Sequence, residues 1–456
     1  MSNQFREIDR SQPIILPGNL EGWLDGDDLA HFIVEVVEVL DTGAIEGEYR
    51  GGGSAPYPPK MLLALLFYCY AKGIFSSRQI ERATYELIPV LYITGGLHPD
   101  HDSINTFRRR FLPQLEPLFV GILLIAQGLG VLKLGDVSLD GTKIQANASK
   151  HKAMSWAYAE RLEQQLKAEV QTLLARAAAV EGPGAVDLDL PAELQRREDR
   201  LAKIAEVKAE IERRAQARYA QEQATHAAKL AERAAKERAR GRKLGGKPPQ
   251  APTPGPRPDD QVNFTDGDSR IMPVSGGGFE QAYNAQATVT MGSLLIIGAH
   301  VTQNPNDKQE MEPAVAELAK RPETLGAVER LAADNGYGSA HNVEILVAAG
   351  IEPLIAVGRQ SHHEALAERL APVPEAPPNP DAMGAMRHRL KTKEGKAFYA
   401  KRKTTSEPVF GIIKEVMGFR RFLLRGLEAV KGEWRLVCLA FNLKRLFVLN
   451  QGVIAS

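Results

Sequence analysis

Three acidic residues stand where a carboxylate could face a ligand. Asp140 and Asp334 each end a short apolar run that is typical of a β-strand, and a glycine follows each of them closely. Taken singly, each aspartate also fits a structural role, because Asp-Gly and Asp-Asn-Gly are common turn sequences. Glu407 falls in the first turn of an expected helix, with Lys414 seven residues later on the same helical face.

The three acids together form the ligand set of a two-metal site. Mg²⁺ binds through a few carboxylates and leaves positions for water and phosphate oxygens. Two such ions, about 3.5–4 Å apart, stabilise the attacking and the leaving oxygen of an in-line phosphoryl displacement. Asp140, Asp334 and Glu407 are therefore the candidate catalytic residues and metal ligands, for two Mg²⁺ ions that Mn²⁺ can replace. The cations before Glu407, Lys401 and Arg402, either pair with it on the surface or bind phosphates.

Other chemistries find little support in the sequence. The pair His362-His363 has no partners at metal-ligand spacing, and neither a Walker-type glycine loop nor a G-x-S-x-G motif occurs. Cys69 and Cys438 each lie in an apolar run and are expected to be buried free thiols in a reducing compartment.

Length and composition describe a globular chain. The 456 residues predict two to four domains; 44% are hydrophobic and 25% charged, with a net charge of +1. The N-terminus lacks a signal-peptide core, and the longest apolar run, 61–71, is about half the length that spans a bilayer. We therefore expect a soluble, cytoplasmic protein without a membrane partner.

The chain divides into segments that differ in composition and in expected secondary structure. Short helices are expected over 56–130, one with the run Arg108-Arg109-Arg110, and they fit either a helix-turn-helix-like DNA-binding unit or a plain bundle with a solvated basic turn. The expected organisation is an N-terminal helical DNA-binding domain at 1–130, the first part of an α/β catalytic domain at 131–151, a helical insert with a Pro-rich linker at 152–258, and the rest of the catalytic domain at 259–456.

The segment 152–258 is an anomaly of composition. It is rich in Ala, Glu, Lys, Arg and Gln, and its apolar residues recur at helical spacing on either side of a break at 182–184, which predicts an antiparallel helical hairpin. Residues 221–247 hold eight Lys or Arg against three Glu, and this basic end is either a solvated face or a DNA contact. From 259 on, a hairpin, strands and helices alternate, which predicts a mixed sheet covered by helices.

Several stretches together resemble bacterial insertion-sequence DDE transposases, most closely the group named after insertion sequence eleven-eighty-two. The stretch 138–149, Ser-Leu-Asp-Gly-Thr-Lys-Ile-Gln-Ala-Asn-Ala-Ser, is similar to the motif of the first aspartate. The other similar stretches are 101–104 with Phe107 and Arg108, 263–272, 283–286, 333–337, and the third-acid motif with Tyr399, Arg402, Glu407 and Lys414. Four residues separate Arg402 from Glu407, where the family pattern usually has three.

The resemblance implies a ribonuclease-H-like catalytic domain interrupted by the insert. Asp140 would end its first strand, Asp334 would end its fourth, and Glu407 would lie on the following helix. Lys414 would contact a phosphate of the end DNA, while Tyr399 and Arg402 would orient the strand. Further DNA contacts are expected from the three consecutive arginines, Arg108, Arg109 and Arg110.

The activity implied is cleavage at transposon ends by metal-activated water, followed by attack of the freed 3′ hydroxyl on target DNA. The expected partners are end DNA, target DNA and further copies of the chain, as a dimer or higher oligomer on DNA near a prokaryotic nucleoid. Two alternatives use the same fold: a domesticated DNA-binding protein, which the presence of all three acids disfavours, and a structure-selective nuclease.

Overall fold

The computed structural model describes residues 18–49, 55–179, 190–274, 277–358, 375–378 and 380–454. The chain divides into two compact units. Unit 1 contains the residues up to 145 and those from 282 onward, and unit 2 contains residues 146–281. The strand that carries Asp140 and the segments that carry Asp334 and Glu407 all belong to unit 1, so a single folded body positions the candidate site.

Unit 1 begins with short helices around one buried helix. That helix, α3, starts at Pro59, because proline suits the first turn, and it is buried from Leu62 to Ala71. The helices of this part are η1 (Glu21–Trp23), α1 (Leu29–Val39), α2 (Gly43–Glu46), α3 (Pro59–Ala71), α4 (Ser77–Glu86), α5 (Ile88–Thr94), α6 (His101–Phe111), η2 (Leu112–Gln114) and α7 (Leu115–Gly128).

The run from α6 through α7 is long and apolar enough to pass a length-and-composition test for a membrane span. Leu118, Phe119, Ile122 and Leu123 of α7 are nevertheless buried within unit 1, where α7 packs against the C-terminal helix. A core helix of a folded unit has this composition, so the run by itself is weak support for a membrane segment.

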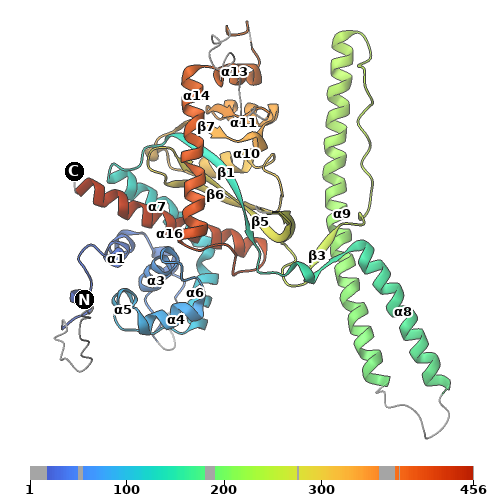
Figure 1. Ribbon diagram of the computed structural model, residues 1–456, viewed down its shortest axis with the longest axis horizontal. Coiled ribbons are helices and arrows are strands. Elements are labelled where there is room, and N and C mark those ends of the chain that lie inside the picture. Colours follow the sequence, from blue (N-terminus) through green and yellow to red (C-terminus); the bar gives the residue numbers. More distant parts are fainter. Residues whose placement is uncertain are drawn as a thin grey trace, which may run out of the picture. The chain divides into compact units, whose positions relative to one another are not determined.

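The sheet of unit 1 is mixed (Figure 1). Its strands are β1 (Gly135–Gln145), β5 (Phe279–Thr290), β6 (Ile296–Thr302), β7 (Val328–Ala333) and β8 (Glu352–Ile355). β5 pairs antiparallel with β1 and with β6, whereas β7 runs parallel to both β1 and β8. The predicted hairpin is confirmed by β5 and β6. In chain order within this unit, β7 is the fourth strand.

The first strand is longer than the sequence suggested. Asp140 was expected to end it, but β1 continues to Gln145, so that expectation is wrong. The reason is the length of β5, which pairs with β1 without interruption from Val137 to Gln145. Asp140 therefore lies inside a strand with fixed backbone geometry, which restricts its side chain more than a turn would.

Helices follow and flank the sheet, and one of them joins its parts. α16 contacts α3, α7 and β6, so it packs against both the N-terminal helices and the sheet, and it buries Trp434 fully. The elements after β6 are α10 (Met311–Leu318), η4 (Glu323–Leu325), η5 (Asn335–Tyr337), α11 (Ala340–Ala348), α13 (Ala382–Arg389), α14 (Lys393–Ala400), η6 (Lys401–Thr404), α15 (Ser406–Gly411), the π-helical turn η7 (Ile412–Val416) and α16 (Leu427–Ile454).

Unit 2 is built on two helices, as the sequence predicted. α8 (Trp156–Ala179) packs against the first half of α9 (Leu190–Arg240) through a seam of buried residues that includes Leu162, Leu166 and Ile211. The expected break at 182–184 lies outside the described residues. The remaining elements are η3 (Lys150–Lys152), β2 (Ala153–Ser155), its antiparallel partner β3 (Gln261–Asn263), and β4 (Arg270–Pro273).

Candidate active site

Asp140 and Asp334 occupy equivalent positions on neighbouring parallel strands. The register pairs Leu139 of β1 with Ala333 of β7, and each aspartate is the next residue along its chain. Neighbouring strands lie about 4.8 Å apart, so the two residues are adjacent across the ladder. Asp334 directly follows β7 and caps η5, where its Oδ1 accepts from the Gly336 amide at 2.8 Å.

Glu407 reaches this region because α15 is fixed on β1. The Ser406 hydroxyl donates to the Ser138 hydroxyl at 2.7 Å, and both residues are buried. Side chains two residues apart on a strand share a face, so Ser138 and Asp140 both point toward α15. The Glu407 carboxylate is 56% exposed, in contrast to that of Asp140, which is 16% exposed.

Arg402 lies between these two acids. Its Nη1 donates to Oδ2 of Asp140 at 3.2 Å, and its Nη2 lies 3.7 Å from Oε1 of Glu407. The guanidinium is placed over the ring of Tyr399, with 6.0 Å from Cζ to the ring centroid. The structure thus brings Tyr399, Arg402, Glu407 and Asp140 together, although four residues rather than three separate Arg402 from Glu407.

The surroundings of Asp140 disfavour its ionised form. Burial raises the pKa of Asp140 to about 6, against a usual value of 3.8; Arg402 opposes the rise, and the carboxylates of Asp334 and Asp307 add to it. Burial is therefore the main reason that Asp140 favours its protonated form, and the nearby acids reinforce it. A carboxylate with a perturbed pKa beside other acids is a frequent feature of catalytic sites.

Asp307 is a fourth acid that the sequence did not single out. Its Oδ1 accepts from the side-chain amides of Asn284 at 2.6 Å and Gln286 at 2.7 Å, and it lies 3.6 Å from Nζ of Lys143. A Cβ at Gly141 would stand 2.7 Å from this oxygen, so the glycine after Asp140 allows the close approach. Nothing in the sequence next to Asp307 distinguishes it from other acids.

The amide of Gln286 links Asp307 to the turn that follows Asp334. Because its nitrogen donates to Asp307, its oxygen is left to accept from the Tyr337 hydroxyl. Tyr337 is fully buried, and burial raises its pKa well above 10. This chain of hydrogen bonds connects β5 with the turn that holds Asp334.

The side chain of Lys414 is hydrogen-bonded to strand β1. Its ammonium donates to the carbonyl of Lys143 in β1 at 3.0 Å, and burial lowers its pKa. It lies in the π-helical turn η7, so its side chain does not follow the simple seven-residue spacing from Glu407. Lys401 and Lys403, in the turn before Glu407, are exposed instead.

The three consecutive arginines differ in their surroundings. Arg108 is buried, and its guanidinium donates to the Tyr70 hydroxyl, the Phe75 carbonyl and the Asn105 side chain. Arg110 is exposed and pairs with an acid at 2.7 Å, and Arg109 is exposed. The cations that this run exposes to solvent are therefore Arg109 and Arg110, because the guanidinium of Arg108 is hydrogen-bonded inside the helical part.

Among the described residues, no three carboxylate, imidazole or thiolate groups converge closely enough to hold a metal ion. The carboxylates of Asp140, Asp334 and Asp307 are nevertheless the hard oxygen donors that a divalent cation such as Mg²⁺ prefers. Cys69 and Cys438 are buried free thiols, as the sequence predicted.

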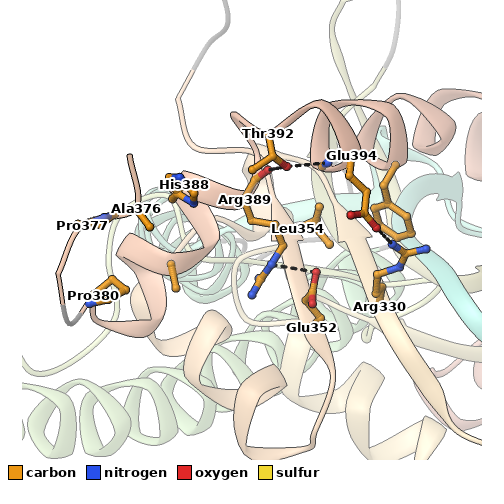
Figure 2. A pocket seen from close by; sticks show the side chains of 13 residues that line it. Arg330, Glu352, Leu354, Ala376, Pro377, Pro380, His388, Arg389, Thr392 and Glu394 are labelled. Atoms are coloured by element: carbon orange, nitrogen blue, oxygen red, sulfur yellow. Dashed lines mark hydrogen bonds and ion pairs between the residues drawn. The ribbon is translucent and has the colours of Figure 1, made fainter. Parts of the chain in front are cut away.

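A hollow of about 470 Å³ lies on another part of the sheet (Figure 2). Its charged side chains are paired with one another: Arg389 with Glu352 at 2.9 Å, and Arg330 with Glu394 at 3.1 Å. Arg330 and Glu352 stand near the amino-terminal ends of β7 and β8, whereas Asp334 follows the carboxyl end of β7. The hollow is therefore separate from the carboxylate site.

The site is thus a group of carboxylates on a mixed sheet, and the helix α15 adds Glu407 to it. Residues 378–447 match the family model of a transposase DDE domain, and residues 19–110 match that of a transposase domain (DUF772). The two matches support an insertion-sequence DDE transposase, a DNA-processing enzyme. Asp140 and Asp334 lie outside the matched regions, whereas Glu407 lies within one. No curated protein and no solved structure matches the chain.

Proposed function

We propose that this protein is a DDE transposase that cleaves the ends of its own element and joins them to target DNA. The observation that carries the proposal is the register of β1 and β7, which sets Asp140 beside Asp334, with Glu407 linked to Asp140 through Arg402. The match of residues 378–447 to a transposase DDE domain supports the same reading for the segment of Glu407.

We also propose a fold for the catalytic domain and a transposase group for the chain. A ribonuclease-H-like catalytic domain with unit 2 inserted after its first strand is supported by the chain order of the strands, because Asp334 follows the fourth strand of unit 1. Assignment to the group of insertion sequence eleven-eighty-two rests on the stretches 138–149 and 333–337.

The side chains of this site have separate roles in the proposed reaction. Asp140 and Asp334 are held by neighbouring strands, so their carboxylates keep a fixed separation while DNA binds. Glu407 is exposed and can approach the scissile phosphate from the helix. Lys401 and Lys403 are exposed in the turn before it and supply the positive charge that phosphate contacts need.

We propose that Asp140, Asp334 and Glu407 hold Mg²⁺, with Mn²⁺ as a substitute. When bound, such ions activate water and stabilise the charge that develops on phosphate oxygens. For Glu407 and Asp140 to act as ligands, the guanidinium of Arg402 has to leave the space between them, where its positive charge now stands.

The test uses the purified full-length chain, DNA duplexes that carry the inverted repeats flanking the gene, and a labelled target duplex. Wild-type protein with Mg²⁺ should cut at the repeat ends and produce joined strands. Asp140→Asn, Asp334→Asn and Glu407→Gln should each abolish both products and retain DNA binding. Glu415→Gln, which changes an exposed acid eight residues further on, is the matched control.

The outcomes separate the candidate functions. Cutting without joining would favour a nuclease, and binding without cutting would favour a domesticated DNA-binding protein. Full cleavage in excess EDTA would overturn the metal assignment. Undiminished cleavage by any one of the three variants would remove that residue from the site.

A further inference from the structure

The two halves of α9 have different surroundings within unit 2. The first half buries Ile204, Val207 and Ile211 in the seam with α8, and the last buried side chain is that of Ala215. From 216 to 240, a stretch that the structure describes throughout, no side chain is buried. At 1.5 Å per residue this second half is roughly 38 Å long. Apolar burial therefore does not explain why this half-helix is ordered.

Polar contacts with the chain that follows α9 hold this half-helix in place. Arg233 donates to the carbonyl of Leu244 at 2.8 Å, and His226 lies 3.1 Å from the carbonyl of Pro249. Arg218 donates to the carbonyl of Gly255 at 3.1 Å and pairs with Asp260 at 2.6 Å. These bonds fix the course of the half-helix along the returning segment.

We call residues 216–247 the basic arm. Its three acids within 221–247 are all engaged: Glu222 with Arg257 at 2.7 Å, Glu232 with Lys236, and Glu237 with Arg233 at 3.2 Å. Six further cations are exposed and have no acidic partner among the described residues. They are Lys229, Arg238, Arg240, Arg242, Lys243 and Lys247.

Helix capping explains only part of this charge. Cations in the last turn interact favourably with the helix dipole, which accounts for Arg238 and Arg240. Arg242, Lys243 and Lys247 follow the helix end, and Lys229 lies about three turns before it, where the dipole effect is small. Uncompensated cations over such a length repel one another, so the bare arm carries an electrostatic cost that an anionic partner would relieve.

We propose that the basic arm binds the phosphate backbone of DNA without reading its sequence. Protein interfaces are enriched in aromatic residues and have an apolar core, whereas Leu230 is the one large hydrophobic side chain exposed on the described arm. Phosphate contact needs only cations that displace counterions. The partner class rests on the proposed function, which makes DNA the substrate; the arm adds a contact surface outside the carboxylate site.

The experiment measures binding of the full-length chain to a random-sequence duplex over a series of salt concentrations. In the arm variant, glutamine replaces all six unpaired cations, because glutamine keeps helix propensity. The control variant replaces six other exposed cations of unit 2 with glutamine. They are Arg161, Lys167, Arg196, Arg200, Lys203 and Arg213. Circular dichroism confirms that both variants fold.

The expected result is a loss confined to the arm variant. Each phosphate contact contributes about 0.9 to the slope of log K against log salt, so six contacts would flatten it by about five. An unchanged slope, or an equal change in the control variant, would overturn the proposal. A changed oligomeric state with an unchanged slope would assign the arm to contacts between copies and would overturn it as well.

The result is separable from the proposed function. If wild-type protein cuts end DNA and the arm variant keeps the full slope, the arm proposal alone fails. If wild-type protein neither cuts nor joins DNA, and the salt dependence of binding is still flatter in the arm variant, the transposase proposal fails. The proposal that the arm binds DNA then stands.

Discussion

The guanidinium of Arg402 contacts the carboxylate of Asp140, with 3.2 Å between Nη1 and Oδ2. Only 12% of the Arg402 side chain is exposed, and its Nε has no hydrogen-bond partner among the described residues. The contact is thus a largely desolvated pair in which the arginine still has an unsatisfied donor. If Asp140 binds a metal as proposed, Arg402 is an internal cation that would compete with it.

Replacing Arg402 with glutamine should therefore tighten metal binding. Loss of one positive charge beside Asp140 and Glu407 is expected to strengthen Mn²⁺ binding by up to about tenfold, which corresponds to roughly 1.4 kcal/mol. The measurement is a Mn²⁺ titration followed by electron paramagnetic resonance, at a pH well above the pKa of Asp140. Arg389→Gln is the control, because Arg389 pairs with Glu352 away from the site. Unchanged or weaker Mn²⁺ binding would show that Arg402 does not compete.

Asp140→Asn should stabilise the metal-free protein at neutral pH. The pKa of Asp140 is raised from 3.8 to about 6 by burial, so the folded state favours the protonated acid. The ionised carboxylate then costs stability, and this cost grows as pH rises from about 4 to 6 and stays constant above that. Two pKa units correspond to at most roughly 3 kcal/mol.

The measurement is thermal unfolding in EDTA at several pH values. The amide introduced by Asp140→Asn cannot ionise, so this variant should melt higher than wild type at neutral pH, and the difference should vanish near pH 4. Asp136→Asn is the control: Arg330 bonds both oxygens of Asp136, so this change should stabilise at no pH. Equal melting temperatures of wild type and Asp140→Asn at neutral pH would show that ionised Asp140 does not destabilise the folded protein.

Some of this arrangement could be predicted from the sequence because it depends on local patterns. The apolar run before Asp334 and the glycine after it predicted a strand followed by a turn, and β7 and η5 have that form. The apolar periodicity of 152–248 predicted α8 and α9 in the same way. Both signals lie within a few turns of chain, where residue spacing alone determines which face is buried.

The remaining features depend on partners distant in sequence. The length of β1 beyond Asp140 is determined by pairing with β5. Two of the three acceptors around the buried Arg108, on Tyr70 and Phe75, lie far from it in sequence, so the arginine run looked like a continuous basic surface. Asp307 is recognisable only once Asn284 and Gln286 are folded against it.

Asp307→Ala should impair catalysis with little effect on DNA affinity. Without the carboxylate, the Gln286 amide loses the partner that orients it toward Tyr337, and the turn behind Asp334 loosens. Partners that orient metal ligands typically change activity about 10–100-fold. Single-turnover cleavage of end DNA measures the effect, and Glu312→Gln, an exposed acid at the start of α10, is the control. A cleavage rate equal to that of wild type would show that the network does not support the site.

Lys414 and Lys403 should respond differently to substitution, because only the Lys414 ammonium is hydrogen-bonded within the fold. The Lys414 ammonium is bound to the Lys143 carbonyl, so Lys414→Met should cost about 1 kcal/mol of unfolding free energy through the lost hydrogen bond. Lys403 is exposed beside Glu407, so Lys403→Gln should leave stability unchanged and flatten the salt dependence of DNA binding by about one phosphate contact. Chemical denaturation measures the stability of both variants, and DNA titrations measure their salt dependence. Each variant is the control for the property that only the other should change. A flattened salt slope in Lys414→Met would mean that this lysine leaves β1 to bind phosphate when DNA is present, as the family resemblance implies.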